Sequence, residues 1–114
     1  MMIRKIVAYK NYFIDFYKNQ DLRVQERTEY ILDLVRFERQ LPEKFYNYLE
    51  NTDGIYEIRV RTISKSIRIL CFQDKGNLVI LINCSVKKTQ KTPENETKLA
   101  EKLKEKYLVE KYGG

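Results

Sequence analysis

The chain has 114 residues, with 22 Lys and Arg, 16 Asp and Glu, no His and a net charge of +6. This length suffices to bury one hydrophobic core, so we expect a single domain over residues 1–114. No apolar run approaches the ~18 residues that span a membrane, and the N-terminus lacks a signal-peptide pattern, which favours a cytoplasmic protein without membrane contact. The absence of His excludes Ser-His-Asp and Cys-His catalysis and HExxH zinc proteolysis.

The two cysteines, Cys71 and Cys84, lie inside apolar runs and lack CxxC spacing. We interpret both as small hydrophobic residues of the core. The sequence therefore predicts neither a disulfide framework nor a zinc site, and no other cofactor is indicated.

The first half of the chain predicts one strand followed by three helices. Residues 2–9 are rich in apolar side chains and contain no breaker, which is typical of a strand. Aromatic residues recur at spacings of three and four over 12–17, and a longer apolar stripe of helical period covers 21–41 until Pro42 ends it. A short third helix is predicted over 43–50, closed by an Asn-Thr-Asp-Gly turn.

The second half of the chain changes to a period of two. Residues 55–61, 67–72 and 78–85 predict three strands joined by short polar loops, as in an antiparallel meander. A final helix is predicted from Pro93 to about Glu110, with Thr92 as its N-terminal cap.

Alternation divides the side chains of these three strands between two faces. The face assigned to the core carries Tyr56, Ile58 and Val60, then Ile67, Ile69 and Cys71, then Ile80, Ile82 and Cys84. The opposite face carries Glu57, Arg59, Arg61 and Arg68. We therefore predict an α+β domain in which helices cover one face of a four-stranded antiparallel sheet, leaving a basic second face.

The positive charge is confined to one part of the chain. Residues 1–54 carry nine basic and nine acidic side chains, and residues 93–114 carry five of each. Residues 55–92 carry eight basic and two acidic side chains, an excess of six that equals the whole net charge. Such a local excess is typical of a polyanion-binding surface.

Three segments resemble a known family. They are Gly54 to Val60, the strand in which Arg68 precedes an apolar run, and the sequence Val-Lys-Lys-Thr-Gln-Lys-Thr-Pro at 86–93. Together they resemble toxins of the RelE/ParE superfamily, on its HigB-like, phage-related branch, over nearly the whole chain. The resemblance implies a RelE-like fold and a ribosome-dependent mRNA endonuclease, with a HigA-like helix-turn-helix antitoxin as its partner.

The resemblance also implies roles for individual residues. Arg59 and Arg61 match basic positions on the second strand of the family, and Arg68 matches the arginine of the third. Lys87 and Lys88 match the basic pair after the fourth strand, and Glu57 matches the acidic member of the E-[IL]-R motif of this branch. RelE itself has a lysine at the position of Glu57 and a tyrosine shortly after the basic pair, whereas the next tyrosine here is Tyr107.

These residues suggest metal-independent RNA cleavage by attack of a ribose 2′-OH on the adjacent phosphate. In this hypothesis Glu57 accepts the 2′-OH proton, Arg59 and Arg68 clamp the phosphate oxygens, and Lys88 donates to the leaving group or stabilises it. Flanking phosphates would be held by Arg61, Lys87 and Lys91.

Simpler interpretations stay open at this stage. Glu57 could form an ordinary cross-strand ion pair with Arg59 or Arg68, and the lysines of 87–91 could serve solubility alone. A ParE-like toxin that poisons DNA gyrase, or a non-catalytic RNA-binding module, would also fit the fold and the charge.

Overall fold

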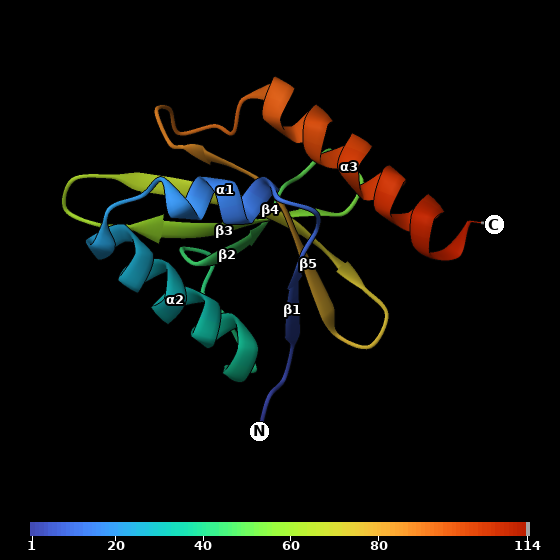
Figure 1. The fold of residues 1–114 in the computed structure, drawn as a ribbon, viewed down its shortest axis with the longest axis horizontal. Coiled ribbons are helices and arrows are strands. Elements are labelled where there is room, and N and C mark those ends of the chain that lie inside the picture. The colour runs from blue at the N-terminus through green and yellow to red at the C-terminus, as the bar shows by residue number, and fades with distance from the viewer. Residues whose placement is uncertain (114) are drawn as a thin grey trace.

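The computed structural model describes residues 1–113 (Figure 1). Its elements are β1 (Lys5–Ala8), α1 (Tyr12–Lys18), α2 (Leu22–Phe37), β2 (Tyr46–Tyr48), β3 (Ile55–Arg61), β4 (Ser66–Asp74), β5 (Leu78–Val86) and α3 (Glu94–Tyr112). One five-stranded sheet has the order β1-β5-β4-β3-β2, in which β1 runs parallel to β5 and the other neighbours are antiparallel. The α+β class is confirmed, but the sheet is mixed and five-stranded where four antiparallel strands were predicted.

The fifth strand is β2, which lies inside the segment 43–50 that was predicted to be helical. The chain makes a single turn after Pro42 and then extends, so that Tyr46 pairs with Ile58 and Tyr48 with Tyr56 on β3. The Tyr46 and Tyr56 rings stack with centroids 4.9 Å apart. Aromatic cross-strand contacts of this kind favour a strand over a helix, and the helical spacing in this short segment was misleading.

Helix α2 begins where expected and ends four residues before the predicted boundary. The Asp21 side chain caps its first turn by accepting a hydrogen bond from the Val24 amide at 2.9 Å. At the other end, the Arg4 guanidinium donates hydrogen bonds to the carbonyls of Val35 at 3.0 Å and Glu38 at 2.8 Å. Because Arg4 satisfies these terminal carbonyls, the helix ends without the proline.

Helices cover both faces of the sheet, and the prediction that they pack on one face is wrong. Helices α1 and α2 cover a core that includes Phe13, Ile31 and Ile58, while α3 covers a second core that includes Phe72 and Leu103. In Figure 1, α1 and α2 lie on one side of the twisted sheet and α3 on the other. Strands β4 and β5 carry apolar side chains on both faces, so both faces can be buried under helices.

The predicted faces are confirmed for β3 and β4 and partly reversed for β5. The side chains of Ile80 and Ile82 pack in the core under α3, whereas Cys84 lies on the α1 and α2 side. The cause is a register shift between β4 and β5 next to Ile69 and Cys71. Such a bulge shifts the alternation of side chains, which periodicity within one strand does not indicate.

Both cysteines are free. Cys71 is buried and Cys84 is half-buried. Burial raises the pKa of the Cys84 thiol to about 12 and raises that of Cys71 as well. Within residues 1–113, no helix combines the length and hydrophobicity that crossing a bilayer would take.

Helix α3 is fastened to the end of β4 by a buried carboxylate. The Asp74 side chain is 4% exposed, and its Oδ2 accepts a hydrogen bond from Tyr107 Oη at 2.6 Å and pairs with Lys111 Nζ at 2.9 Å. Tyr112 Oη donates to Asp74 Oδ1 at 2.9 Å. Burial alone would raise the pKa of Asp74, but these hydrogen bonds outweigh it and hold the pKa well below its usual range.

We expect Asp74→Asn to lower the free energy of unfolding by about 1.5–3 kcal/mol at pH 7, because it removes hydrogen bonds to a charged group. The folded-state pKa is lowered, so the stabilisation is full above the unfolded pKa of about 3.9 and decreases as the pH falls further. Urea unfolding of both proteins at pH 7 and pH 3 measures this effect. If the two proteins differ in free energy of unfolding by the same amount at both pH values, the stabilising role of the Asp74 carboxylate is contradicted.

Candidate functional site

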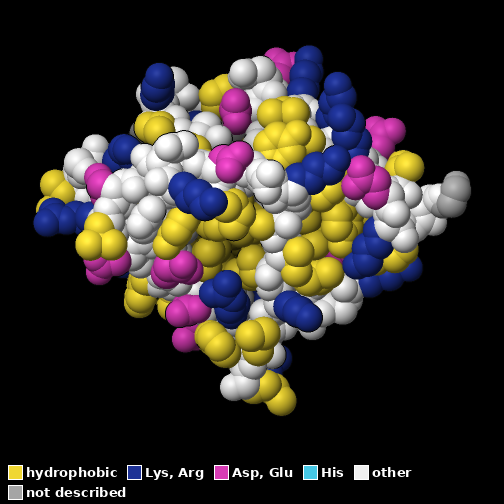
Figure 2. Space-filling view, viewed as in Figure 1, with side chains coloured by type: hydrophobic (Ala, Val, Ile, Leu, Met, Phe, Trp, Pro, Cys, Tyr) yellow, Lys and Arg dark blue, Asp and Glu magenta, His cyan; other side chains and the backbone are white. Residues whose placement is uncertain are grey.

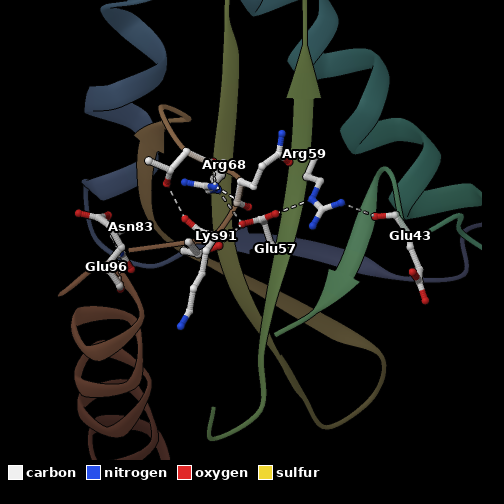
Figure 3. Close-up of polar contacts among 10 residues, drawn as sticks. Glu43, Glu57, Arg59, Arg68, Asn83, Lys91 and Glu96 are labelled. Atoms are coloured by element: carbon white, nitrogen blue, oxygen red, sulfur yellow. Dashed lines mark hydrogen bonds and ion pairs between the residues drawn. The ribbon is translucent and has the colours of Figure 1, made fainter. Parts of the chain in front are cut away.

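Two arginines lie directly opposite each other on neighbouring strands. Arg59 of β3 pairs in register with Arg68 of β4, an arrangement in which like charges repel. The Glu57 carboxylate lies between the two arginine side chains and relieves this repulsion (Figure 3). Arg59 Nε lies 2.5 Å from Glu57 Oε1, and Arg68 Nε lies 3.0 Å from Glu57 Oε2.

Glu57 is buried, contrary to its predicted position on an open, solvated face. Glu57 and Arg68 are each 1% exposed. The buried Thr92 hydroxyl donates a hydrogen bond of 2.6 Å to Glu57 Oε2. Thr92 therefore does not cap α3 as predicted, and the cap residue of that helix is Pro93. We refer to Glu57, Arg59, Arg68 and Thr92 as the central cluster.

Arg68 also holds the loop that follows β5. Its Nη2 donates hydrogen bonds to the carbonyl oxygens of Thr89 at 2.5 Å and Gln90 at 3.2 Å. Together with the bond from Thr92 to Glu57, these contacts tie residues 89–92 of the loop to Arg68 on β4 and Glu57 on β3. The conformation of the basic loop therefore depends on a buried ion pair.

Arg59 is the member of the central cluster that reaches the surface. It is half-buried, with 35% of its side chain exposed, and its Nη1 lies 3.5 Å from the Glu43 carbonyl (Figure 3). Two hollows meet at this residue. A ligand in either hollow could contact the Arg59 guanidinium, whose orientation is fixed by Glu57.

One hollow, which we call the basic hollow, has a volume of about 320 Å³ and lies between α2 and the ends of β3, β4 and β5. Five cationic side chains and no acidic one line it. Its lining residues are Arg27, Lys44, Phe45, Arg59, Val60, Arg61, Ser66, Ile67 and Lys87. This hollow has the composition of an anion-binding site.

Lys87 is the half-buried lysine of the basic hollow. Burial lowers the pKa of Lys87 below its ordinary value, and the nearby charges of Arg59 and Arg68 lower it further. Lys87 therefore gives up its proton more readily than an ordinary surface lysine.

The second hollow at Arg59, which we call the loop cleft, has a volume of about 500 Å³. It lies between the turn after β2 and the start of α3, and Lys91 lines it. The Lys91 side chain points away from Glu57 (Figure 3). Lys88 is exposed and lines a separate shallow hollow together with Arg61 and Lys87.

The predicted residues are thus brought together in part. Arg59, Arg61 and Lys87 share the basic hollow, whereas Lys91 and Lys88 line two other hollows, and Arg68 is buried and lines none of the three. Tyr107, the first tyrosine after the loop, contacts Asp74 at the other end of β4. Figure 2 shows one face of the molecule, on which Lys and Arg side chains are scattered among apolar and acidic ones instead of forming a continuous patch.

Three residues of the site were missed from the sequence. Arg27 and Lys44 lie in the half of the chain whose net charge is zero, so charge counting along the sequence gave no reason to single them out. Thr92 was assigned to a helix cap, because a Thr directly before Pro93 is typical of that role. Nothing in the sequence indicated its contact with Glu57. Residues 1–113 contain no group of three or more Cys, Asp or Glu side chains arranged to hold a metal ion.

Residues 15–105 match the family described as Phage derived protein Gp49-like (DUF891). A chain of the archaeal RelE-RelB complex from Pyrococcus horikoshii OT3 is similar in structure, with a TM-score of 0.56 and 17% sequence identity over 75% of this chain and 96% of that chain. No curated protein matches the chain significantly.

The fold is therefore RelE-like. The chain belongs to the Gp49-like family of phage-derived proteins, which confirms the predicted phage-related affiliation.

Proposed function

We propose that the protein is the toxin of a type II toxin-antitoxin module and an endoribonuclease that cleaves mRNA on the ribosome. The observation that carries this proposal is the convergence of Arg59, Arg61 and Lys87 on one hollow beside a buried carboxylate. Family membership and the RelE-like fold support the toxin assignment. The cytoplasm, where ribosomes translate, is the corresponding location.

The proposed reaction is attack of a ribose 2′-oxygen on the adjacent phosphorus. The bond between phosphorus and the 5′-oxygen breaks, which leaves a 2′,3′-cyclic phosphate and a 5′-hydroxyl. This reaction needs positive charge against the phosphorane, an acceptor for the 2′-OH proton and a donor to the 5′-oxygen.

We assign phosphate binding to Arg59, whose guanidinium is exposed in part and oriented by Glu57. Forked hydrogen bonds from such a group suit the phosphorane oxygens. Glu57 and Arg68 are buried, and both Glu57 oxygens are engaged by Arg59, Arg68 and Thr92. For this reason we propose that Glu57 and Arg68 are positioning residues, in place of the substrate contacts expected from the sequence.

Proton transfer is then assigned to the lysines. Lys87 lines the basic hollow beside Arg59, and we propose that it accepts the 2′-OH proton after giving up its own, a loss that burial favours by lowering the pKa of Lys87. Lys88 keeps its expected role of donating a proton to the 5′-oxygen, and Arg61 and Lys91 are proposed to bind flanking phosphates.

A cognate antitoxin is the second proposed partner. RelE in the structural neighbour is solved in complex with RelB. We propose a HigA-like helix-turn-helix protein that blocks the toxin described here.

Induction in growing cells tests the proposal. We expect growth arrest, with new mRNA 5′ ends inside translated regions within minutes, and relief by co-expressed antitoxin. DNA damage signalling with intact mRNA would instead identify the protein as a gyrase poison. RNA binding without growth arrest would assign a non-catalytic module.

A further inference from the structure

Part of the basic hollow is built by residues outside the basic segment 55–92. Arg27 comes from the middle of α2, and Lys44 comes from the turn before β2. The fold thus adds two cations from a neutral half of the chain to three from the basic segment.

Four of these five cations have no carboxylate partner. Among residues 1–113, the ion pairs include none formed by Arg27, Lys44, Arg61 or Lys87. Acidic side chains are available next to them in sequence, since Glu26 precedes Arg27 and Glu43 precedes Lys44. The cations instead line the wall of a cavity that holds no acidic side chain.

The aromatic contacts agree with this arrangement. The Lys44 ammonium lies 5.0 Å from the centroid of the Phe45 ring, and the Arg27 guanidinium lies 5.0 Å from that of Tyr30. Such contacts orient a cation without neutralising its charge. Each cation therefore remains available to an anionic ligand.

We propose that Arg27 and Lys44 form a second phosphate subsite for single-stranded RNA, which binds the phosphodiester next to the one held by Arg59. This inference rests on the proposed function and extends it to a defined path for the RNA strand. A volume of about 320 Å³ lies at the lower end of the range for ligand sites, which suits one phosphodiester with its ribose. Because Arg59 lines the same hollow, a strand with one phosphate on Arg59 can extend within the hollow toward Arg27 and Lys44.

The test is a binding measurement that does not depend on cleavage. A fluorescent single-stranded RNA octamer with 2′-O-methyl riboses cannot react, and its anisotropy reports affinity as a function of salt concentration. For the doubly substituted protein with Arg27→Gln and Lys44→Gln, we expect at least tenfold weaker binding at low salt. The slope of log K against log salt should become shallower by about 0.7 for each phosphate that the protein no longer binds.

The matched control carries Arg23→Gln and Lys106→Gln, which change the net charge equally at exposed positions outside the hollow. We expect its affinity to stay within twofold of the unsubstituted protein. Lys44→Gln alone should give part of the loss in RNA affinity without destabilising the fold, because Lys44 is exposed. Thermal unfolding verifies that every variant is folded.

Two results would overturn the inference. One is equal RNA affinity in the R27Q/K44Q variant and the control, with cleavage of ribosome-bound mRNA by the unsubstituted protein intact. The other is tighter binding of an octameric glutamate peptide than of RNA, abolished in the R27Q/K44Q variant, which would assign the subsite to an acidic protein segment. Absence of any mRNA cleavage by the unsubstituted protein, with the difference in RNA binding preserved, would overturn the proposed function alone.

Discussion

Replacing Arg68 with methionine is expected to lower the free energy of unfolding by about 3–5 kcal/mol, because it leaves the buried Glu57 without one of its two cations. The substitution also removes the hydrogen bonds to the Thr89 and Gln90 carbonyls, which frees the loop after β5. Urea unfolding followed by circular dichroism measures the change. A loss near zero would show that the ion pair does not hold this part of the fold.

Lys98→Met provides the control for this measurement. Lys98 forms an ion pair of the same type with Glu94 at 3.0 Å, but both side chains are exposed. Its removal should cost less than about 0.5 kcal/mol, since exposed helical pairs contribute little. A double-mutant cycle of Glu57→Gln with Arg68→Met then isolates the coupling between the two buried groups.

Replacing Arg59 with glutamine is expected to lower the rate of mRNA cleavage about 100- to 1,000-fold, the usual effect of removing one donor to a developing anionic charge. Stability should change much less than in Arg68→Met, because Arg59 is partly exposed and Glu57 keeps its partners Arg68 and Thr92. Single-turnover cleavage of ribosome-bound mRNA measures the rate.

Arg23→Gln, an exposed substitution on α2, should leave the rate unchanged in the same assay. If the cleavage rate of Arg59→Gln is within twofold of the rate of the unsubstituted protein, Arg59 takes no part in the reaction. The two main variants therefore separate two roles of neighbouring arginines. Arg68 is expected to affect mainly the fold and the loop, whereas Arg59 is expected to affect mainly the chemical step.

Much of the fold could be predicted because local patterns decide it. The change of period after Gly54 located β3, β4 and β5, and Asp21 marked the start of α2. The mistakes arose where distant contacts decide the structure. Arg4 ends α2 early, and stacking on Tyr56 converts the segment around Tyr46 into a strand.

The candidate site was predictable in its charge and less so in its geometry. Alternation placed Glu57 on the same face as Arg59 and Arg68, which the structure bears out. The burial of Glu57 could not be anticipated, because it depends on Thr92 and the loop folding back over that face. Arg27 and Lys44 reach the basic hollow only through tertiary packing, so no local pattern singled them out.

The most direct test of the central proposal uses purified protein in a reconstituted translation reaction. The account predicts cleavage of the mRNA within ribosomes, with 5′-hydroxyl and 2′,3′-cyclic phosphate ends, and strongly reduced cleavage by the Arg59→Gln variant. Intact mRNA on translating ribosomes would contradict it, if expression of the same protein in cells arrests growth.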